Sequence, residues 1–170
     1  MFRPMRRTRQ ELSPEECSRI LERGNSGVLA VCEEGDYPYA VPLSYAYLPS
    51  TGQLGSVVFH CSQQGHKIEA LRSNPRVSFC VIDRDEPIPA EFATHYISVI
   101  AFGTIRFVES ANEKRELLTA LGAKYSPGLD SEAQEEIDRF IKATCVLELQ
   151  IEHLSGKQAK ALASAVASQQ

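Results

Sequence analysis

The sequence predicts a mainly β domain with peripheral helices, in which the strands form a closed antiparallel barrel. Short apolar segments recur along the 170 residues, and turns rich in glycine and proline separate them, which is typical of strands joined by short connections. Few helical segments lie between these strands, so an antiparallel barrel is favoured over a parallel sheet. No internal repeat, low-complexity linker or change of composition divides the chain, and we therefore expect one domain over residues 1–170.

The N-terminal part is predicted to contain a basic arm and then a helix. Residues 1–10 carry four arginines, which we expect on a solvated terminus or on a strap against a partner subunit. Ser13 and Glu16 have the spacing of a capping box, and Pro14 lies at the first helical position. Gly24 then predicts the end of this helix.

The remaining elements are predicted from apolar runs and turn residues. Residues 37–47 are interrupted by Pro38 and Pro42, and because proline cannot donate to a ladder, we expect this strand at a sheet edge or bulged. The other expected elements, in chain order, are strands at 27–32 and ending at His60, a helix from His66 that ends before Asn74, a strand at 76–83, a loop at 85–93, a strand at 96–108, helices at 111–124 and from about Ser131, a strand at 144–151 and a C-terminal tail at 158–170 that is frayed from Ser164.

The composition argues against several classes of protein. A formal net charge of −4 and an isoelectric point near 5.6 disfavour a nucleic-acid-binding protein, which usually presents a basic face. No stretch approaches the roughly 20 apolar residues of a membrane span, and the N-terminus lacks the apolar region of a signal peptide. We therefore expect a cytoplasmic protein with neither nucleic acid nor membrane as a partner.

The cysteines are predicted to be reduced. They are odd in number, widely spaced and without a Cys-x-x-Cys pair, so we expect thiols that act mostly as small core residues. Cys61 directly follows His60, and alternation along a strand places these two side chains on opposite faces. A redox role for Cys61 is therefore a minor alternative. The five residues are Cys17, Cys32, Cys61, Cys80 and Cys145.

The most informative segment of the chain predicts a phosphate site. An apolar strand stops at His60, a polar turn containing Gly65 follows, and a helix opens with His66 and Lys67. The first N–H groups of a helix have no intrahelical partner, and the helix dipole adds positive charge at the same end. Two cationic side chains there oppose the dipole unless an anion lies between them. Because no glycine-rich cradle or Walker lysine is present, we expect the phosphate of a cofactor rather than a nucleoside triphosphate.

These features resemble the FMN-binding split-barrel proteins of the pyridoxamine 5′-phosphate oxidase-like superfamily, in particular the nitroimidazole-resistance (Nim) flavoproteins. The resemblance covers about Arg6 to Lys157. It implies a split β-barrel that forms a two-fold homodimer, with FMN at the interface and a small-molecule substrate. The segments that carry it, in their order and spacing, are Val41-Pro42-Leu43-Ser44-Tyr45, the run from His60 to Lys67, the strand Tyr96-x-Ser98-Val99, and Ser155-Gly156-Lys157.

The resemblance also implies which residues form the site. His60 matches the histidine that faces flavin and substrate in the Nim-like proteins, and an imidazole titrating near neutral pH can donate a proton to a reduced substrate. Tyr96 and Ser98 share one strand face, near the expected flavin and its ribityl chain. The expected cofactor-binding residues are Pro42, Leu43, Ser44, His60, Ser62, Gly65, His66, Lys67, Tyr96, Ser98, Val99, Gly156 and Lys157.

The sequence disfavours several other chemistries and leaves some alternative functions open. None of the four histidines has a partner at a local ligand spacing, which disfavours a metal site, and no Gly-x-Ser-x-Gly nucleophile elbow occurs. The preferred function is an FMN-dependent reductase of nitroimidazoles or similar electron-poor molecules. The alternatives are a strict pyridoxamine phosphate oxidase, disfavoured by the lack of an Arg-x-His signature near the C-terminus, a deazaflavin or haem binder on the same barrel, and a non-enzymatic FMN-binding protein.

Overall fold

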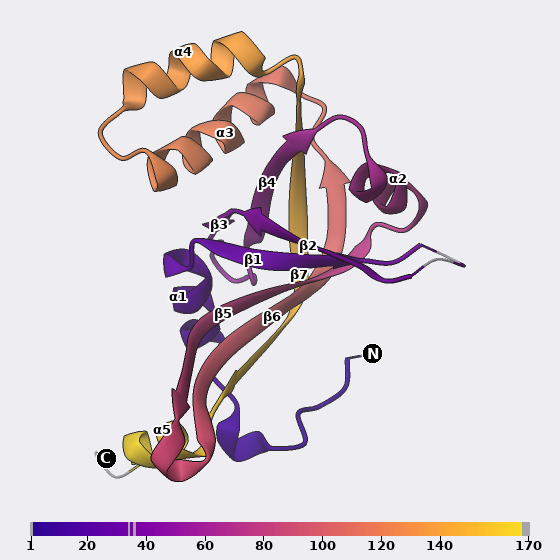
Figure 1. Ribbon diagram of the computed structural model, residues 1–170. Helices are drawn as coiled ribbons and strands as arrows, with labels where there is room; N and C mark the ends of the chain where they lie inside the picture. The colour runs from indigo at the N-terminus through magenta and orange to yellow at the C-terminus, as the bar shows by residue number, and fades with distance from the viewer. Residues whose placement is uncertain (1, 34, 36, 168–170) are drawn as a thin grey trace.

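A curled antiparallel sheet of seven strands dominates the computed structural model, which describes residues 2–33, 35 and 37–167, the last four of these by their backbone alone (Figure 1). The strand order is β2-β1-β5-β6-β7-β4-β3. The strands are β1 (Ser26–Val31), β2 (Tyr39–Ser44), β3 (Ala46–Leu48), β4 (Ser56–Ser62), β5 (Arg76–Ile88), β6 (Ala93–Phe107) and β7 (Thr144–Gln158). The helices are α1 (Pro14–Arg23), α2 (His66–Ser73), α3 (Ala111–Tyr125), α4 (Asp130–Phe140) and α5 (Lys160–Ala167), with 3-10 turns at Thr8–Gln10 and Pro89–Glu91. The mainly β class with peripheral helices is confirmed.

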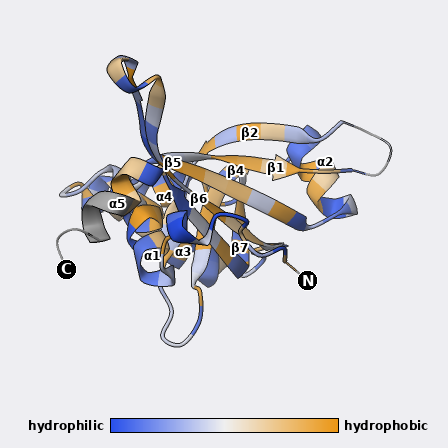
Figure 2. Ribbon diagram, turned by 90° about the horizontal axis from the view of Figure 1, so that it is seen from below, coloured by the Kyte–Doolittle hydropathy of each residue, from blue (hydrophilic) through white to orange (hydrophobic). Residues whose placement is uncertain are grey.

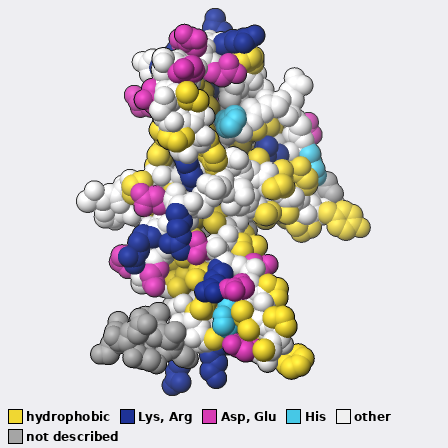
Figure 3. Space-filling view, turned by 60° about the vertical axis from the view of Figure 1, so that its left-hand side comes forward, with side chains coloured by type: hydrophobic (Ala, Val, Ile, Leu, Met, Phe, Trp, Pro, Cys, Tyr) yellow, Lys and Arg dark blue, Asp and Glu magenta, His cyan; other side chains and the backbone are white. Residues whose placement is uncertain are grey.

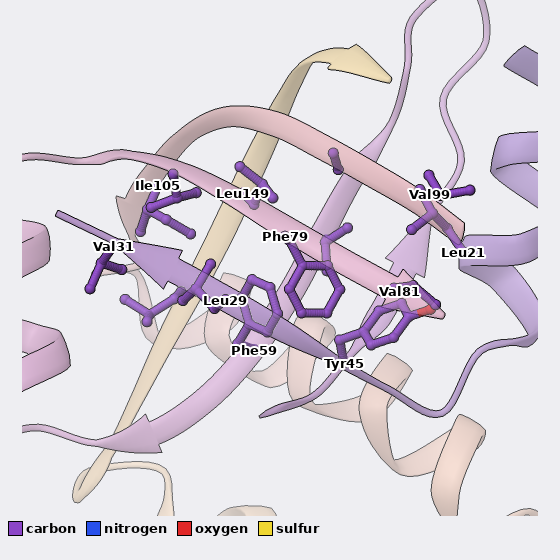
Figure 4. Packing of buried hydrophobic residues seen from close by; sticks show 14 of the residues in the cluster. Leu21, Leu29, Val31, Tyr45, Phe59, Phe79, Val81, Val99, Ile105 and Leu149 are labelled. Carbon is purple, nitrogen blue, oxygen red and sulfur yellow. The ribbon is translucent and has the colours of Figure 1, made fainter. Parts of the chain in front are cut away.

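The hydrophobic interior is built around three aromatic side chains. Tyr45, Phe59 and Phe79 are fully buried, and the Phe79 ring meets each of the other two edge-on with centroids 4.9 Å apart (Figure 4). Leu21 of α1 and Leu71 of α2 pack into the same cluster. Hydropathy alternates along the strands, as expected for a sheet with one face on the core (Figure 2). Edge-to-face contacts add to the free energy of burying these large rings.

Local signals place the N-terminal elements correctly. Ser13 Oγ accepts a hydrogen bond from the Glu16 N–H at 3.2 Å, and Glu16 Oε2 accepts one from the Ser13 N–H at 2.8 Å, which completes the capping box. β2 is an edge strand, as Pro42 indicates. The strand expected at 37–47 divides at Tyr45, because the backbone N–H and carbonyl of this residue bond to a tyrosine hydroxyl of α3. β2 and β3 therefore lie at opposite ends of the strand order.

The prediction of a loop at 85–93 is wrong. β5 continues to Ile88 and β6 begins at Ala93, so this segment forms the end of a long β-hairpin that turns through Pro89–Glu91. Its prolines and acidic residues reflect exposure to water rather than loss of strand pairing. Pro87 remains in the ladder because it lies on an exposed part of the hairpin, where a missing N–H donor leaves no buried group unpaired.

The last strand and the tail also differ from the prediction. β7 is expected at 144–151 but continues to Gln158, because a bulge at Glu152 lets its ladder with β6 resume beyond the polar residues. Ser155, Gly156 and Lys157 therefore belong to a paired strand. The expected tail carries α5 up to Ala167, and residues 168–170 lie outside the described part of the chain.

The basic arm packs partly against the sheet. The Phe2 ring stacks on the His153 ring with centroids 4.6 Å apart, and Gln10 is buried. The arginines of the arm remain exposed. The arm thus combines two anchored side chains with solvated charges.

The α3–α4 hairpin stands on the outer face of the sheet, on the side of β4 away from α2 (Figure 1). Leu117 and Leu121 of α3 pack against Val58 of β4 and Val146 of β7, forming a second, smaller hydrophobic cluster. Arg106 of β6 ties α3 to the sheet through ion pairs with one glutamate on β7 and one on α3. These two leucines thus face the sheet, while part of the hairpin leaves space beside it.

Candidate functional site

The residues predicted for the site fall into two separate groups. The first, called the β4–α2 group, lies where β2 and β4 end and α2 begins, and consists of Ser44, His60, Ser62, Gly65, His66 and Lys67. The second, called the β6–β7 group, lies where β6 begins and β7 ends, and consists of Tyr96, Ser98 and Lys157. Figure 1 shows these places at opposite ends of the molecule, the second beside α5. One copy of the chain does not bring all of these residues together.

A cleft of about 1120 Å³ lies between the α3–α4 hairpin and the end of β4, and we call it the hairpin cleft. Its polar wall contains three members of the β4–α2 group and a threonine: Ser44, His60, Ser62 and Thr144. Its apolar wall comes from the helices and includes Leu118, Leu121, Leu129, Ile137, Phe140 and Ile141. Figure 3 shows acidic side chains gathered over this helical hairpin at the top of the molecule. A mostly apolar cleft with a few polar groups on one wall suits a small organic molecule.

His60 faces the hairpin cleft. It lies on the same side of β4 as Val58, which packs under α3, and its side chain is exposed. Among the described residues, the His60 ring has no hydrogen-bond partner. It is therefore not a histidine tied to a neighbouring loop, and its two ring nitrogens are accessible to a bound molecule.

The start of α2 has the features of an anion site. Gly65 precedes the helix with φ +117°, a conformation suited to glycine, and no side chain of the described residues caps the first turn. The His66 ring stacks on the Tyr39 ring of β2 with centroids 4.4 Å apart, which holds β2 beside the helix. Lys67 is half-buried on the same turn. Free N–H groups, an open glycine and two basic side chains fit a phosphate monoester.

Cys61 borders the hairpin cleft, but alternation along β4 turns its side chain to the core cluster. It lies directly opposite Cys145 in the β4–β7 ladder, and both thiols pack on the inner face of the sheet. The hydrogen bond that Cys145 donates and the nearby Lys67 ammonium lower the pKa of the Cys61 thiol to about 7. The same hydrogen bond and burial raise the pKa of Cys145. Sequence reasoning missed Cys145, because only the strand register brings it to Cys61.

The β6–β7 group is held in place by strand pairing. Ser98 lies directly opposite Lys157, and the Lys157 Nζ is 5.4 Å from the centroid of the Tyr96 ring. All three side chains are half-buried. They form a small polar and aromatic surface at the end of a rigid ladder.

Three residues expected in the site have side chains or backbone in the interior. Val99 is fully buried, and Leu43 packs on the core cluster. A Cβ on Gly156 would lie 2.3 Å from the Cys17 Sγ, so this glycine allows α1 to pack closely on β7. Their positions are explained by packing, and we leave them out of the proposed site. Pro42, by contrast, lies on the outer face of β2 and is exposed.

The outer face of the sheet exposes an apolar row across four strands. Pro42, Val28, Cys80 and Ile100 lie directly opposite one another on β2, β1, β5 and β6. The neighbouring Ile82 is 63% exposed and Val28 is 39% exposed. Exposed apolar side chains that adjoin one another in this way are typical of an interaction surface.

Comparison with known proteins identifies relatives of this chain. The sequence model of the family described as pyridoxamine 5′-phosphate oxidase matches residues 13–158. An uncharacterized protein of Rhizobium meliloti is 35% identical over 94 residues, and the matched region spans 54% of this chain and about half of that protein (52%).

Three solved structures share the fold. A FAD-binding protein of Mesorhizobium loti is 26% identical, with a TM-score of 0.61, and the match covers 89% of this chain and 98% of that chain. A FAD and heme binding protein of Mycobacterium smegmatis is 23% identical, with a TM-score of 0.72 and coverage of 93% and 80%. A candidate 5-nitroimidazole antibiotic resistance protein of Bacteroides thetaiotaomicron is 17% identical, with a TM-score of 0.71 and coverage of 87% and 86%.

The described residues contain neither a group of metal ligands nor a membrane-spanning helix. No three of their histidine, cysteine and acidic side chains are grouped so that they could hold a metal ion. Within the same part of the chain, no helix is long and apolar enough to cross a membrane.

Proposed function

Because the chain belongs to the pyridoxamine 5′-phosphate oxidase family, we propose that it is an FMN-dependent reductase of small electron-poor molecules such as nitroimidazoles. One observation carries this proposal: His60, which has no hydrogen-bond partner among the described residues, lies between a basic helix start that no described side chain caps and a largely apolar cleft. An anion site, a proton donor and a substrate cleft are thus adjacent. The named flavin-binding relative with the same fold supports a flavin as the cofactor.

The FMN phosphate is proposed to bind at the start of α2. The uncapped N–H groups after Gly65 donate to the phosphate, and Lys67 and His66 add charge-assisted hydrogen bonds. Gly65 leaves open space where any other residue would carry a side chain, since nothing lies within 4 Å of the Cβ it lacks. The stacking of His66 on Tyr39 orients the imidazole before the cofactor binds.

The reacting end of the site is proposed to lie at His60. A bound flavin supplies the electrons, and the residues of this chain supply orientation and protons. His60 donates a proton to the substrate as negative charge develops on it, with Ser44 and Ser62 on the same wall of the hairpin cleft. The leucines and isoleucines of α3 and α4 bind the apolar part of an aromatic substrate and exclude water.

We further propose that the protein is a two-fold homodimer. The β6–β7 group lies too far along the barrel to join the β4–α2 group of its own chain (Figure 1). In a dimer that buries the apolar row containing Val28 and Ile100, a two-fold axis would let each subunit complete the site of the other. Ser98 and Lys157 would then face a flavin held by the partner subunit.

Sedimentation of the flavin-loaded protein at micromolar concentration tests the dimer. The wild type is expected to sediment as a dimer and Ile82→Asp as a monomer with reduced flavin binding, because a buried carboxylate at an apolar interface is costly. Ile82 is 63% exposed in the single chain, so this substitution is expected to leave the fold intact. A flavin-loaded monomer of the wild type would rule the dimer out.

The proposed function is tested by identifying the bound cofactor and by measuring the reaction with a nitroimidazole. Freshly purified protein is expected to be yellow, to release FMN on heating and, once chemically reduced, to convert a nitroimidazole with reoxidation of its flavin. Release of FAD would show that the cofactor is FAD, as in the names of two structural relatives. A Soret band would indicate haem. Bound FMN without reduction of any nitroaromatic would leave a flavin-binding protein that is not this reductase.

A further inference from the structure

Cys61 and Cys145 form a close thiol pair that the proposed flavin chemistry does not use. They are directly opposed on β4 and β7, and the interaction between the two thiols is the largest cause of the shifted pKa of each. Opposed residues of an antiparallel ladder have Cα atoms about 4.5–5.5 Å apart. A disulfide bridges Cα separations of about 4.4–6.8 Å. The strand register therefore already holds the two cysteines at a distance that a disulfide can span.

Lys67 makes the two thiols of this pair different in reactivity. Its ammonium, on the first turn of α2, helps to lower the pKa of the Cys61 thiol, and it has no comparable effect on the pKa of Cys145. Cys61 is half-buried and Cys145 is buried. Cys61 is thus the more accessible thiol and the one whose thiolate is stabilised, whereas Cys145 keeps its proton.

The other cysteines lack these features. Cys17 is buried on the inner side of α1, where burial raises the pKa of its thiol to about 11. Burial also raises the pKa of Cys80, which lies on the outer face of β5. Cys32 is exposed, and the only described hydrogen bond of its thiol is a weak one to a backbone carbonyl. The combination of a thiol partner and a cationic neighbour occurs at Cys61 alone in the described part of the chain.

We propose that Cys61 and Cys145 are a peroxide-oxidisable dithiol, which forms a reversible disulfide between β4 and β7. The Cys61 thiolate attacks one oxygen of hydrogen peroxide, the O–O bond breaks, and the leaving hydroxide takes a proton to become water. Cys61 is then a sulfenic acid. The Cys145 sulfur attacks the Cys61 sulfur, the S–O bond breaks, and the Cys145 proton leaves with the hydroxyl group as a second water. Two thiols lose two electrons in total and one peroxide gains them.

The experiment treats the full-length protein with hydrogen peroxide, blocks the remaining thiols with iodoacetamide and maps the peptides without reduction. The expected product is one cross-linked pair of peptides containing Cys61 and Cys145, which dithiothreitol separates. It should form at least about tenfold faster than Cys32 is oxidised, because Cys32, although better exposed, has no cationic partner among the described residues. Oxidation of Cys32 first, oxidation of Cys61 with Cys145 still alkylated, or resistance of both cysteines would each overturn the proposal.

Two variants separate the steps of the reaction. In Cys145→Ser, Cys61 should stop at the sulfenic acid, which dimedone traps, whereas Cys32→Ser should form the disulfide at the wild-type rate. In Lys67→Met, the disulfide should still form but about 3- to 10-fold more slowly at neutral pH, since less thiolate is present. An unchanged rate in Lys67→Met would contradict the role of the lysine. A failure of Cys145→Ser to fold would leave the wild-type time course to decide the proposal.

Discussion

His60 and Cys61 are neighbours in the chain, yet the two faces of β4 give them different surroundings. The His60 face opens into the hairpin cleft, and its imidazole has no partner among the described residues. The Cys61 face turns inward, where the thiol meets Cys145 and the Lys67 ammonium. One strand end therefore presents a solvent-accessible proton donor on one side and a protected thiol pair on the other. Two consecutive residues can do both because side chains alternate between the two faces of a strand.

Lys67 connects these two faces. It belongs to the proposed phosphate site at the start of α2, and it also helps to lower the pKa of the Cys61 thiol. An ammonium group has three N–H donors, so it can serve a phosphate oxygen and a sulfur together. The comparison therefore predicts that changes at His60 alter turnover alone, while changes at Lys67 alter both cofactor binding and thiol reactivity.

The largest effect is expected for His60→Gln. The variant should keep its flavin and its oligomeric state, because His60 is an exposed side chain outside the hydrophobic clusters. Reduction of a nitroimidazole by the chemically reduced protein should slow by about 10²–10⁴-fold if His60 is the proton donor. Stopped-flow measurement of flavin reoxidation gives this rate.

A matched control is His95→Gln. His95 is paired with Glu91 on the exposed β5–β6 hairpin, with Nε2 and Oε2 3.0 Å apart, and its loss should leave the rate unchanged. Wild-type turnover in His60→Gln with full flavin bound would make His60 structural and remove the catalytic assignment.

The next largest effect is expected for Lys67→Ala. Losing a charge-assisted hydrogen bond costs roughly 1.5–3 kcal/mol, which is about ten- to a hundredfold in FMN affinity. Riboflavin, which lacks the phosphate, should bind weakly to both proteins and be nearly indifferent to the change. Fluorescence titration with each ligand measures the two affinities. Lys142→Ala, at an exposed lysine beyond α4, is the control. Equal losses for FMN and riboflavin would place the phosphate elsewhere.

The elements that sequence reasoning placed correctly depend on local chemistry. The capping box at Ser13, the edge position of Pro42 and the helix start at His66 each follow from a few adjacent residues, whose preferences act within one turn or one ladder position. The β5–β6 hairpin was missed because Pro87 and its acidic neighbours report solvent exposure, which a paired hairpin also tolerates. Composition alone does not separate a loop from an exposed ladder.

The candidate site was predictable in its residue types and not in its assembly. His60, Ser62 and Lys67 lie near one another because they are close in sequence. The hairpin cleft depends on where α3 and α4 pack, and the Cys61–Cys145 pair depends on a register between distant strands. Neither is encoded by a local pattern. The β6–β7 group lies at the far end of the barrel for the same reason.

A smaller effect is expected in the pH dependence of Cys61 alkylation. The Cys145 hydrogen bond and Lys67 lower the pKa of Cys61 to about 7, while Lys114 and Glu109 act on Cys145 with opposite signs. Reaction with iodoacetamide should therefore rise through about pH 7 and be about tenfold faster at that pH than for a free thiol of pKa about 8.5 with equal access. Lys67→Ala should move this rise to higher pH. If the pH profile of Cys61 alkylation matched that of a free cysteine, the proposed stabilisation of the Cys61 thiolate would be wrong.

The smallest effect is expected on the apolar wall of the hairpin cleft. Leu118 is half-buried on α3 and faces the cleft from the side opposite His60. In Leu118→Ala, an aromatic substrate loses part of one apolar contact, worth about 0.5–1 kcal/mol, so kcat/KM for a nitroimidazole should fall about 2- to 5-fold. Because the substituted side chain is remote from α2, FMN affinity should not change. Steady-state kinetics on Leu118→Ala and on Leu54→Ala, a half-buried leucine before β4 and outside the cleft, separate a substrate contact from a general loss of packing. Equal kinetics in both variants would mean that the substrate binds outside this cleft and that His60 faces it from another direction.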